Sequence, residues 1–291
     1  MKLVRFGPPG RERPGLWLDS APGVQGPALL DVNAMAFDIA DYDSHFFAHG
    51  GLSRLSALMK DPRPRHVPAA GMRLGPPVAR PANILCLGKN YAEHAREFGG
   101  PVPDQPVVFA KASTSLCGAY DEIELPPGAG RVDGEAELAI VIGRRAHALD
   151  LASAMGVIAG YTVLNDVTDR DLQKSGLQWF LAKSADTFCP LGPWLVTPDE
   201  VPDPHRLRVF STLNGEPVQD GSTADMVFRI PEILVYISRI ITLEPGDIVS
   251  TGTPAGIGSI HNPARLLLPG RVLETGVEGL GVQRAVIQQR A

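Results

Sequence analysis

The sequence predicts an α+β protein built mainly from β-strands, with a small N-terminal α/β domain. Its 291 residues include 31 glycines and 27 prolines, a content typical of chains with many turns and short strands. Strand-like apolar runs outnumber helical ones, and no G-x-G-x-x-G or Walker sequence follows a strand, which argues against a doubly wound nucleotide-binding sheet. We expect the small domain to span residues 1–75 and a larger domain to span residues 80–291.

The N-terminal domain is expected to contain short elements of both kinds. These are strands at Lys2–Phe6 and around Gly15–Leu18, and helices near Asp43–His49 and Leu52–Met59. The segment Asp61–Pro68 should form neither a helix nor a central strand, because its prolines lack the N–H donor. A second proline-rich segment, Gly75–Pro81, follows at once. The boundary between the two domains is therefore expected between about residues 70 and 82.

The larger domain is expected to be dominated by strands. Asp150 is a favourable N-cap for an apolar-periodic segment that Gly160 would end, which predicts a helix over Leu151–Ile158. Pro231 and Glu232 favour the start of another helix, with an apolar stripe that runs from Ile233 to Ile241. The expected strands are Ile84–Leu87, Glu135–Ile142, Tyr161–Val167 and Ile248–Thr251.

Charge and composition exclude several classes of protein. The net charge of -5 argues against a surface for nucleic acid or anionic membranes. No apolar run approaches the roughly 18 residues of a membrane span, and the first residues lack the apolar core of a secretory signal. Three well-separated cysteines form neither a disulfide framework nor a zinc pattern. A cytoplasmic protein that acts on a small molecule is expected.

The most informative pattern is a set of three carboxylates at strand ends. Glu135 and Glu137 begin one apolar strand-like run and share a face of it, and Asp166 ends the next run. Glutamates about 6–7 Å apart repel on a buried face, and Mg²⁺ or Mn²⁺ would relieve that repulsion. The alternative is a solvated strand with glutamates at alternate positions. Apolar residues on both faces favour burial, where carboxylates are paired or metal-bound.

Other polar residues lie near these strands in the sequence. Arg170 and Gln173 follow Asp166 and offer a forked and a neutral donor to a substrate carboxylate. His94 and Glu97 lie at i and i+3 if Tyr91–Phe98 is helical, where the carboxylate would orient the imidazole as a general base. The alternative is a solvated helix with a chance His–Glu pair. The glycines after this segment fit a lid that closes over ligand.

Lys183 and two further histidines require separate interpretations. Lys183 lies in an apolar stretch, which suits either a lysine aimed at a developing oxyanion or an ordinary snorkelling surface lysine. His45 and His49 have helical spacing but no nearby acidic ligands, so we expect them on a helix surface. The chain has no G-x-S-x-G elbow and no H-E-x-x-H motif.

Six motifs follow one another in the larger part of the chain: Gly88-Lys89-Asn90-Tyr91-x-x-His94-x-x-Glu97, Phe109-x-Lys111, Glu135-x-Glu137, Asn165-Asp166-x-x-x-Arg170-x-x-Gln173, Lys183-Ser184-x-Asp186-Thr187 and Thr251-Gly252-Thr253-Pro254. Through these motifs the chain resembles, from about Asn83 to Gly281, the fumarylacetoacetate hydrolase superfamily, in particular bacterial members similar to acylpyruvate and 2,4-diketo-3-deoxy sugar acid hydrolases. The resemblance implies a mixed β-roll fold and a homodimer.

The resemblance also implies a role for each motif residue. Glu135, Glu137 and Asp166 would bind Mg²⁺ or Mn²⁺. His94 and Glu97 would form the water-activating dyad, and Lys183 would stabilise an enolate or oxyanion. The remaining residues implied to hold the acid and keto oxygens of the substrate are Arg170, Gln173 and Thr253.

The reaction expected from these roles is hydrolysis of a carbon–carbon bond in a 2,4-dioxo acid, which releases pyruvate. The same metal site could instead serve a decarboxylase, an isomerase or a dehydratase of a related 2-oxo acid. A non-catalytic metal- or ligand-binding module is a third possibility, but it would need neither the dyad nor the lysine.

Overall fold

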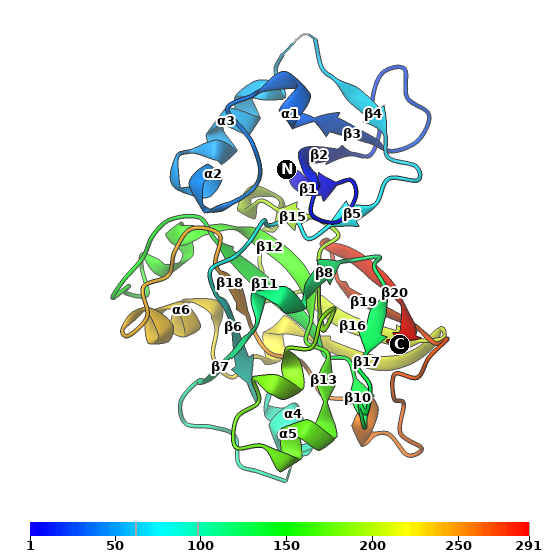
Figure 1. Cartoon of the computed structure of the whole chain (residues 1–291). Coiled ribbons are helices and arrows are strands. Elements are labelled where there is room, and N and C mark those ends of the chain that lie inside the picture. Colours follow the sequence, from blue (N-terminus) through cyan, green and yellow to red (C-terminus); the bar gives the residue numbers. More distant parts are fainter. Residues whose placement is uncertain (62, 98, 291) are drawn as a thin grey trace.

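A computed structural model describes residues 1–61, 63–97 and 99–290, and it consists mainly of strands (Figure 1). Thirteen strands of the described chain form one mixed sheet. Its main path is β4 (His66–Pro68), β3 (Ala28–Asp31), β2 (Arg13–Leu18), β1 (Lys2–Phe6), β15 (Leu195–Val196), β12 (Ile158–Asn165), β11 (Ala136–Ile142), β18 (Ile248–Ser250), β6 (Ile84–Gly88) and β7 (Val107–Lys111). Beside this path lie β5 (Leu74–Gly75), β8 (Leu116–Gly118) and β14 (Cys189–Leu191).

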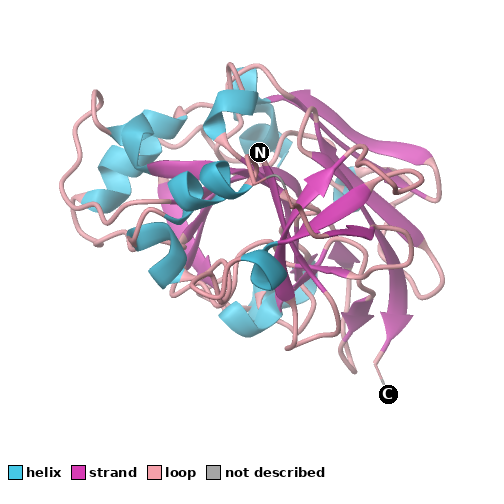
Figure 2. Ribbon diagram, turned by 90° about the horizontal axis from the view of Figure 1, so that it is seen from above, coloured by secondary structure: helices cyan, strands magenta, loops and turns pink. Residues whose placement is uncertain are grey.

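A second sheet and a short ribbon complete the strand structure. The second sheet has the order β17 (Glu216–Ser222), β16 (Arg208–Leu213), β19 (Val272–Val277), β20 (Gly281–Gln289) and β9 (Ile123–Leu125), and the ribbon pairs β10 (Val132–Asp133) with β13 (Thr168–Asp169). Short helices lie mostly on the side away from the C-terminal strand (Figure 2). They are α1 (Val32–Met35), α2 (Ser44–Ala48), α3 (Gly51–Leu58), α4 (Ala92–Glu97), α5 (Arg170–Ser175) and α6 (Ile230–Ser238). The mixed-sheet architecture with few helices confirms the predicted fold class.

The N-terminal strands extend the sheet of the larger part. β1 pairs antiparallel with β15, which places Leu3 opposite Leu195. The expected strands of this region and the helices α2 and α3 are confirmed. The proline-rich segment adds only β4, which lies at the edge of the sheet as its prolines require. Pro62 within that segment, and Phe98 at the end of the expected helix Tyr91–Phe98, lie outside the described residues.

The predicted helix over Leu151–Ile158 is wrong. Only a 3₁₀ turn forms there, at Ala154–Val157, and strand β12 begins directly at Ile158. Gly160 is not a helix stop but a close contact between strands, because a Cβ there would lie 2.4 Å from the carbonyl oxygen of Val196. The pairing of β12 with β11 and β15 thus outweighs the local apolar periodicity.

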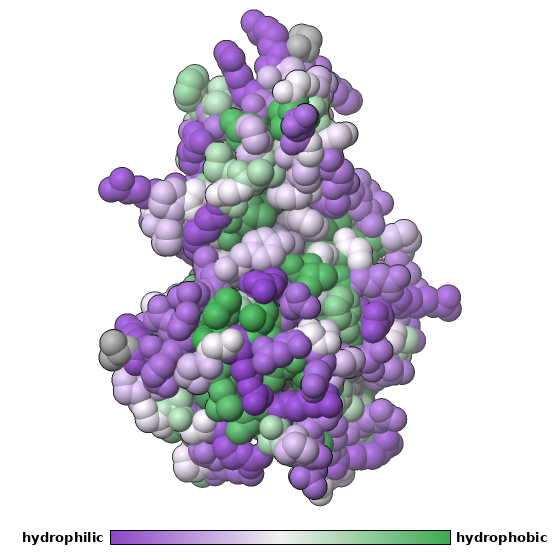
Figure 3. All heavy atoms as spheres, turned by 90° about the vertical axis from the view of Figure 1, so that its right-hand side faces the viewer, coloured by the Kyte–Doolittle hydropathy of each residue, from purple (hydrophilic) through white to green (hydrophobic). Residues whose placement is uncertain are grey.

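Helix α6 is also shorter than its apolar stripe. It ends at Ser238, and Ile240, which follows, is 85% exposed. On the face that Figure 3 shows, hydrophobic residues form separate patches among hydrophilic ones. No helix among the described residues is long and apolar enough to cross a membrane.

One apolar cluster joins the N-terminal strands to the larger part. Leu3, Leu16 and Tyr42 pack together with Val141 and Leu195. We propose that residues 1–75 and 80–291 are two structural units with a boundary between about residues 70 and 82. Because they share this apolar cluster, we expect both units to unfold in a single step. Calorimetry should then give one transition whose calorimetric and van't Hoff enthalpies agree. An earlier, separate transition of the N-terminal unit would contradict this.

Candidate metal centre and active site

The antiparallel pairing of β11 and β12 brings the three predicted carboxylates together. Ala136 lies opposite Asn165, and the carbonyl of Glu135 accepts from the amide of Asp166 at 2.9 Å. One oxygen from each of Glu135, Glu137 and Asp166 can be chosen so that all three lie within 4.8 Å of one another, and all three side chains are buried. This geometry is that of a carboxylate site for a metal ion, as the sequence pattern predicted.

Two cationic side chains compensate the negative charge of Glu135. Its Oε1 accepts from Arg170 Nη2 at 2.6 Å and its Oε2 accepts from Lys183 Nζ at 2.9 Å. Burial alone would raise the pKa of Glu135, but Arg170 and Lys183 outweigh burial and lower this pKa below its usual value. Glu135 is therefore ionised and fixed in position.

The negative charge of Glu137 is compensated much less than that of Glu135. Its Oε2 accepts from the hydroxyl of Ser250 and, at 3.1 Å, from the amide of Gly252. Among the described residues, no lysine, arginine or histidine lies within ion-pair distance of Glu137. Burial, together with the charges of Asp166 and Glu135, raises the pKa of Glu137 well above its usual value. A buried carboxylate of this kind, beside two others, fits a hard divalent cation.

Asp166 lies between two buried lysines. Lys183 Nζ donates to its Oδ2 at 2.5 Å and Lys111 Nζ donates to its Oδ1 at 2.7 Å. Lys111 also donates to the carbonyl of Lys183, and Lys183 to Thr168 Oγ1 at 2.8 Å. Burial would lower the pKa of Lys183, but Asp166 and Glu135 raise it above the usual value. Lys183 is therefore protonated and buried, not a snorkelling surface lysine.

Replacing Lys111 with methionine is expected to lower the free energy of unfolding by about 3–5 kcal/mol. The substitution leaves one oxygen of the fully buried Asp166 and the carbonyl of Lys183 without their donor. Urea denaturation with EDTA present measures this loss without a contribution from bound metal. A loss below about 1 kcal/mol would show that the Lys111–Asp166 pair is not structural.

His94 and Glu97 form the predicted hydrogen-bonded pair on α4. His94 Nδ1 lies 3.1 Å from Glu97 Oε2, and His94 Nε2 lies 4.0 Å from Glu135 Oε1. Glu97 Oε1 accepts from the amide of Gly256 at 2.7 Å, so one carboxylate fixes both the imidazole and a loop. A carboxylate partner favours the tautomer with the proton on Nδ1, which gives Nε2 the lone pair.

The three residues implied to hold substrate all line the same cavity. Arg170 donates to Asp133 Oδ1 from Nε at 2.7 Å, and to Gln173 Oε1 from Nη1 at 3.0 Å. Asp133 and Glu135 raise the pKa of Arg170 against the opposing effect of burial. Thr253 Oγ1 donates to the carbonyl of Ala136 at 2.8 Å.

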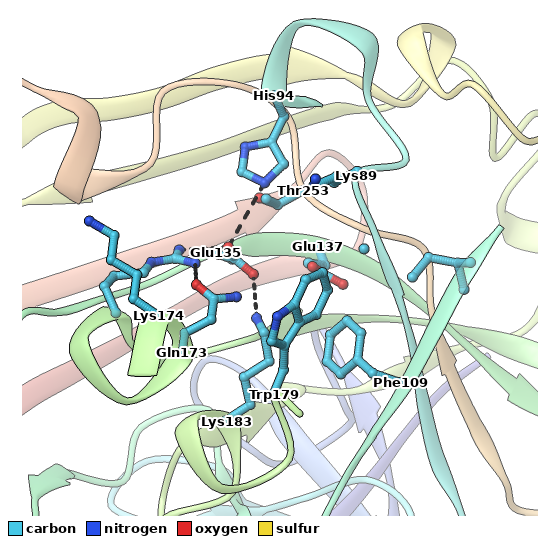
Figure 4. Close-up of a pocket in the computed structure, with 13 residues that line it drawn as sticks. Lys89, His94, Phe109, Glu135, Glu137, Gln173, Lys174, Trp179, Lys183 and Thr253 are labelled. Atoms are coloured by element: carbon cyan, nitrogen blue, oxygen red, sulfur yellow. Dashed lines mark hydrogen bonds and ion pairs between the residues drawn. The ribbon is translucent and has the colours of Figure 1, made fainter. Parts of the chain in front are cut away.

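The cavity has a volume of about 270 Å³. His94 lies above the carboxylates and Lys183 below them, and Phe109 and Trp179 form an apolar wall (Figure 4). The lining residues are Leu87, Gly88, Lys89, His94, Phe109, Glu135, Glu137, Arg170, Gln173, Lys174, Trp179, Lys183 and Thr253. Seven of the nine predicted site residues line the cavity. The other two, Asp166 and Glu97, lie directly behind it, Asp166 beside Glu135 and Glu137 and Glu97 beside His94.

Sequence reasoning missed three polar residues that support the site. Lys111 appeared in a motif without a role, while Asp133 and Ser250 were not singled out. The only available signal was a charge at the end of an apolar strand, as for Lys111 in Val107–Lys111. Away from the site, His45 and His49 lie exposed on α2 and at its end, as expected. The three cysteines are free, as their spacing predicted, and they are buried.

The loop after β18, residues 252–256, holds two carboxylates of the site. Its amides at Gly252 and Gly256 donate to Glu137 and Glu97, so this loop holds one carboxylate of the triad and one of the dyad. Gly252 adopts a φ of 90°, a left-handed conformation that favours glycine.

Comparison with known proteins adds three relationships. The chain is 42% identical, over 285 residues and 97% of both chains, to a Burkholderia cenocepacia protein. The name of that protein describes it as a hydrolase and specifies no substrate. It matches 5-carboxymethyl-2-hydroxymuconate delta-isomerase from Mycobacterium smegmatis with a TM-score of 0.77 and 32% identity, over all of both chains. It matches maleylpyruvate hydrolase from Sphingobium sp. SYK-6, in complex with manganese(II) ion and pyruvate, with a TM-score of 0.80 and 28% identity, again over all of both chains.

Hydrolases and isomerases thus both occur among the structural neighbours. The family model for the fumarylacetoacetate (FAA) hydrolase C-terminal region matches residues 83–288, which include every residue of the carboxylate triad and the dyad. With a match over most of its length and a 42% identical full-length relative, the chain belongs to the fumarylacetoacetate hydrolase family.

Proposed function

We propose that the protein is a divalent-metal-dependent hydrolase that cleaves a carbon–carbon bond in a 2,4-dioxo acid and releases pyruvate. The observation that supports this most directly is the His94–Glu97 pair, whose imidazole Nε2 lies 4.0 Å from the metal-site carboxylate Glu135. A site for enolate chemistry alone requires the carboxylates and Lys183. A carboxylate-oriented imidazole adds what hydrolysis needs, a base for water.

Glu135, Glu137 and Asp166 would hold Mg²⁺ or Mn²⁺. Their buried oxygens suit a hard cation, and the maleylpyruvate hydrolase relative is in complex with manganese. When bound, the cation supplies a Lewis acid and a template for the acid and keto oxygens of the substrate.

His94 would remove a proton from the attacking water at its Nε2. Glu97 accepts the Nδ1 proton of the same ring, which holds the imidazole in place and stabilises the imidazolium that forms. The water would add to the 4-carbonyl, and the bond between C3 and C4 would then break, with its electron pair leaving on the pyruvate fragment as an enolate. Return of the proton from the His94 imidazolium to C3 of the enolate would give pyruvate and restore the base.

The buried cations would stabilise that enolate. Lys183 is buried and stays protonated, and its positive charge beside Glu135 and Asp166 would stabilise the developing negative oxygen. Arg170, held by Asp133, and its partner Gln173 would bind the substrate carboxylate. Thr253 would contact a keto oxygen of the substrate.

Pyruvate release from a panel of acylpyruvates and diketo-deoxy sugar acids, with Mg²⁺ or Mn²⁺ present, tests the proposal. Product analysis by NMR should show pyruvate and the carboxylic acid of the acyl group in equal amounts. Release of carbon dioxide, or formation of an isomer without cleavage, would instead show the decarboxylase or isomerase reaction. No reaction with any member of the panel would overturn the proposal.

A further inference from the structure

Gln219 is a buried polar side chain of the second sheet that does not line the cavity. It lies on β17 and is 2% exposed. Its Oε1 accepts from the amide of Ala136 at 3.0 Å and from the hydroxyl of Ser211 at 3.1 Å. Its Nε2 donates to Thr253 Oγ1 at 2.8 Å and to the carbonyl of Pro254 at 2.9 Å. All four hydrogen-bonding positions of the side-chain amide are therefore occupied.

The orientation of this side-chain amide follows from its partners. The backbone N–H of Ala136 can only donate and the carbonyl of Pro254 can only accept, so the oxygen and the nitrogen of Gln219 cannot exchange places. Thr253 Oγ1 accepts from Gln219 and donates its own proton to the carbonyl of Ala136 at 2.8 Å. Gln219 thus holds both backbone polar groups of Ala136, the N–H directly and the carbonyl through Thr253.

Ala136 is the residue between the two metal-site glutamates, at the start of β11. One edge of β11 pairs with β12 along its whole length. On the other edge β18 pairs only with the segment from Ala139 to Val141, so among the described strands none lies beside Ala136 there. Buried backbone groups need hydrogen-bond partners, and at this edge the side chains of Gln219 and Thr253 replace the missing strand.

Strand β17, which carries this side chain, also packs closely against the loop after β18. A Cβ on Gly221 would lie 2.5 Å from Pro254, and a Cβ on Gly256 would lie 2.9 Å from the carbonyl oxygen of Val218. The same loop donates a backbone hydrogen bond to Glu137 at 3.1 Å. The second sheet therefore supports the metal centre both at β11 and at this loop.

We propose that Gln219 is a positioning residue for the metal centre. By fixing the backbone of Ala136, it sets the spacing of Glu135 and Glu137, whose side chains leave the same face of the strand on either side of that residue. A buried amide with every partner in place has a single arrangement, so the two carboxylates are already ordered when an ion binds. This inference rests on the metal site of the proposed function and not on the reaction.

The Mn²⁺ affinity of the full-length protein without substrate tests the assignment. EPR measures the free Mn²⁺ during a titration and so gives Kd. Gln219→Met keeps the approximate length of the side chain and removes all four hydrogen bonds, and Gln219→Asn keeps an amide that is one methylene shorter. We expect both substitutions to raise Kd about 10–100-fold, as for other residues that orient metal ligands.

Gln283→Met is the matched control. Gln283 is also 2% exposed. Its Nε2 donates to three backbone carbonyls, those of Val163, Pro190 and Gly192, the first two at 3.0 Å. This substitution should lower Tm in EDTA, as Gln219→Met does. It should leave Kd unchanged within about twofold, because a loss of stability alone does not change the affinity of the folded protein for an ion.

The possible results separate this inference from the function on which it rests. If neither Gln219 variant raises Kd, or if Gln283→Met raises it as much, Gln219 only stabilises the fold and the assignment is overturned. If Gln219→Met does not fold, the result for Gln219→Asn decides. If the wild type binds Mn²⁺ but releases no pyruvate, the hydrolase proposal fails and the titration still tests Gln219. If the wild type binds no Mn²⁺, the proposed metal site is wrong and this inference fails with it.

Discussion

Replacing Glu137 with glutamine is expected to abolish metal binding and to lower kcat/KM by about a thousandfold or more, since the Lewis acid supplies several kcal/mol of transition-state stabilisation. Glu137 is the triad member that no described cation pairs with, so its charge is the one that a bound metal ion would compensate. In the wild type, metal at about 100 times its Kd should stabilise the fold by about 2.7 kcal/mol. In Glu137→Gln this stabilisation should disappear.

The metal-free variant should be at least as stable as the metal-free wild type. Glutamine keeps an oxygen for Ser250 and Gly252, and its amide group can donate toward the nearby carboxylates Asp166 and Glu135. It also removes a charge that burial disfavours. Thermal melts with Mn²⁺ and with EDTA measure both effects, with Glu124→Gln, on β9 and away from the cavity, as the matched control. A Glu137→Gln protein that keeps the metal-dependent shift in Tm would contradict the metal site.

Replacing His94 with glutamine is expected to lower hydrolysis by about 10²- to 10⁴-fold, the usual contribution of a general base. The metal site does not need the imidazole, so the metal-dependent rise in Tm should remain. Full hydrolytic activity in His94→Gln would rule out the dyad.

The Glu97→Gln variant provides a comparison for the loss of hydrolysis in His94→Gln. Glu97 acts through His94 and also holds the loop at Gly256, and glutamine can still accept the Gly256 amide. We therefore expect a smaller loss of activity, about 10–100-fold, similar to that for other partners that orient a functional ligand. The pH profile of kcat/KM should shift with the basicity of His94, which a purely structural defect would not produce.

The sequence predicted the parts of the site that depend on local spacing. Residues at i and i+2 in a strand share a face, and residues at i and i+3 in a helix are neighbours, so the pairs Glu135–Glu137 and His94–Glu97 could be recognised before any fold was known. The family resemblance then indicated that motifs far apart in the sequence, such as those of Asp166 and Lys183, belong to one site.

The contacts that the sequence could not predict join residues far apart in the chain. Lys111 meets Asp166 across 55 positions, and Ser250 meets Glu137 across 113. Neither pair leaves a periodic signal, because each depends on which strands become neighbours in the sheet. The expected helix at Leu151–Ile158 failed for the same reason, since strand pairing around Gly160 outweighed a favourable local pattern.

The placement of Trp179 gives the cavity an intrinsic optical reporter. The other two tryptophans of the chain, Trp17 and Trp194, lie against each other with ring centroids 5.2 Å apart, and only Trp179 lines the cavity with the carboxylate triad. A paramagnetic ion such as Mn²⁺ should quench its fluorescence, whereas diamagnetic Mg²⁺ should not. Ion occupancy and exchange between the two metals could then be followed in solution without any added label.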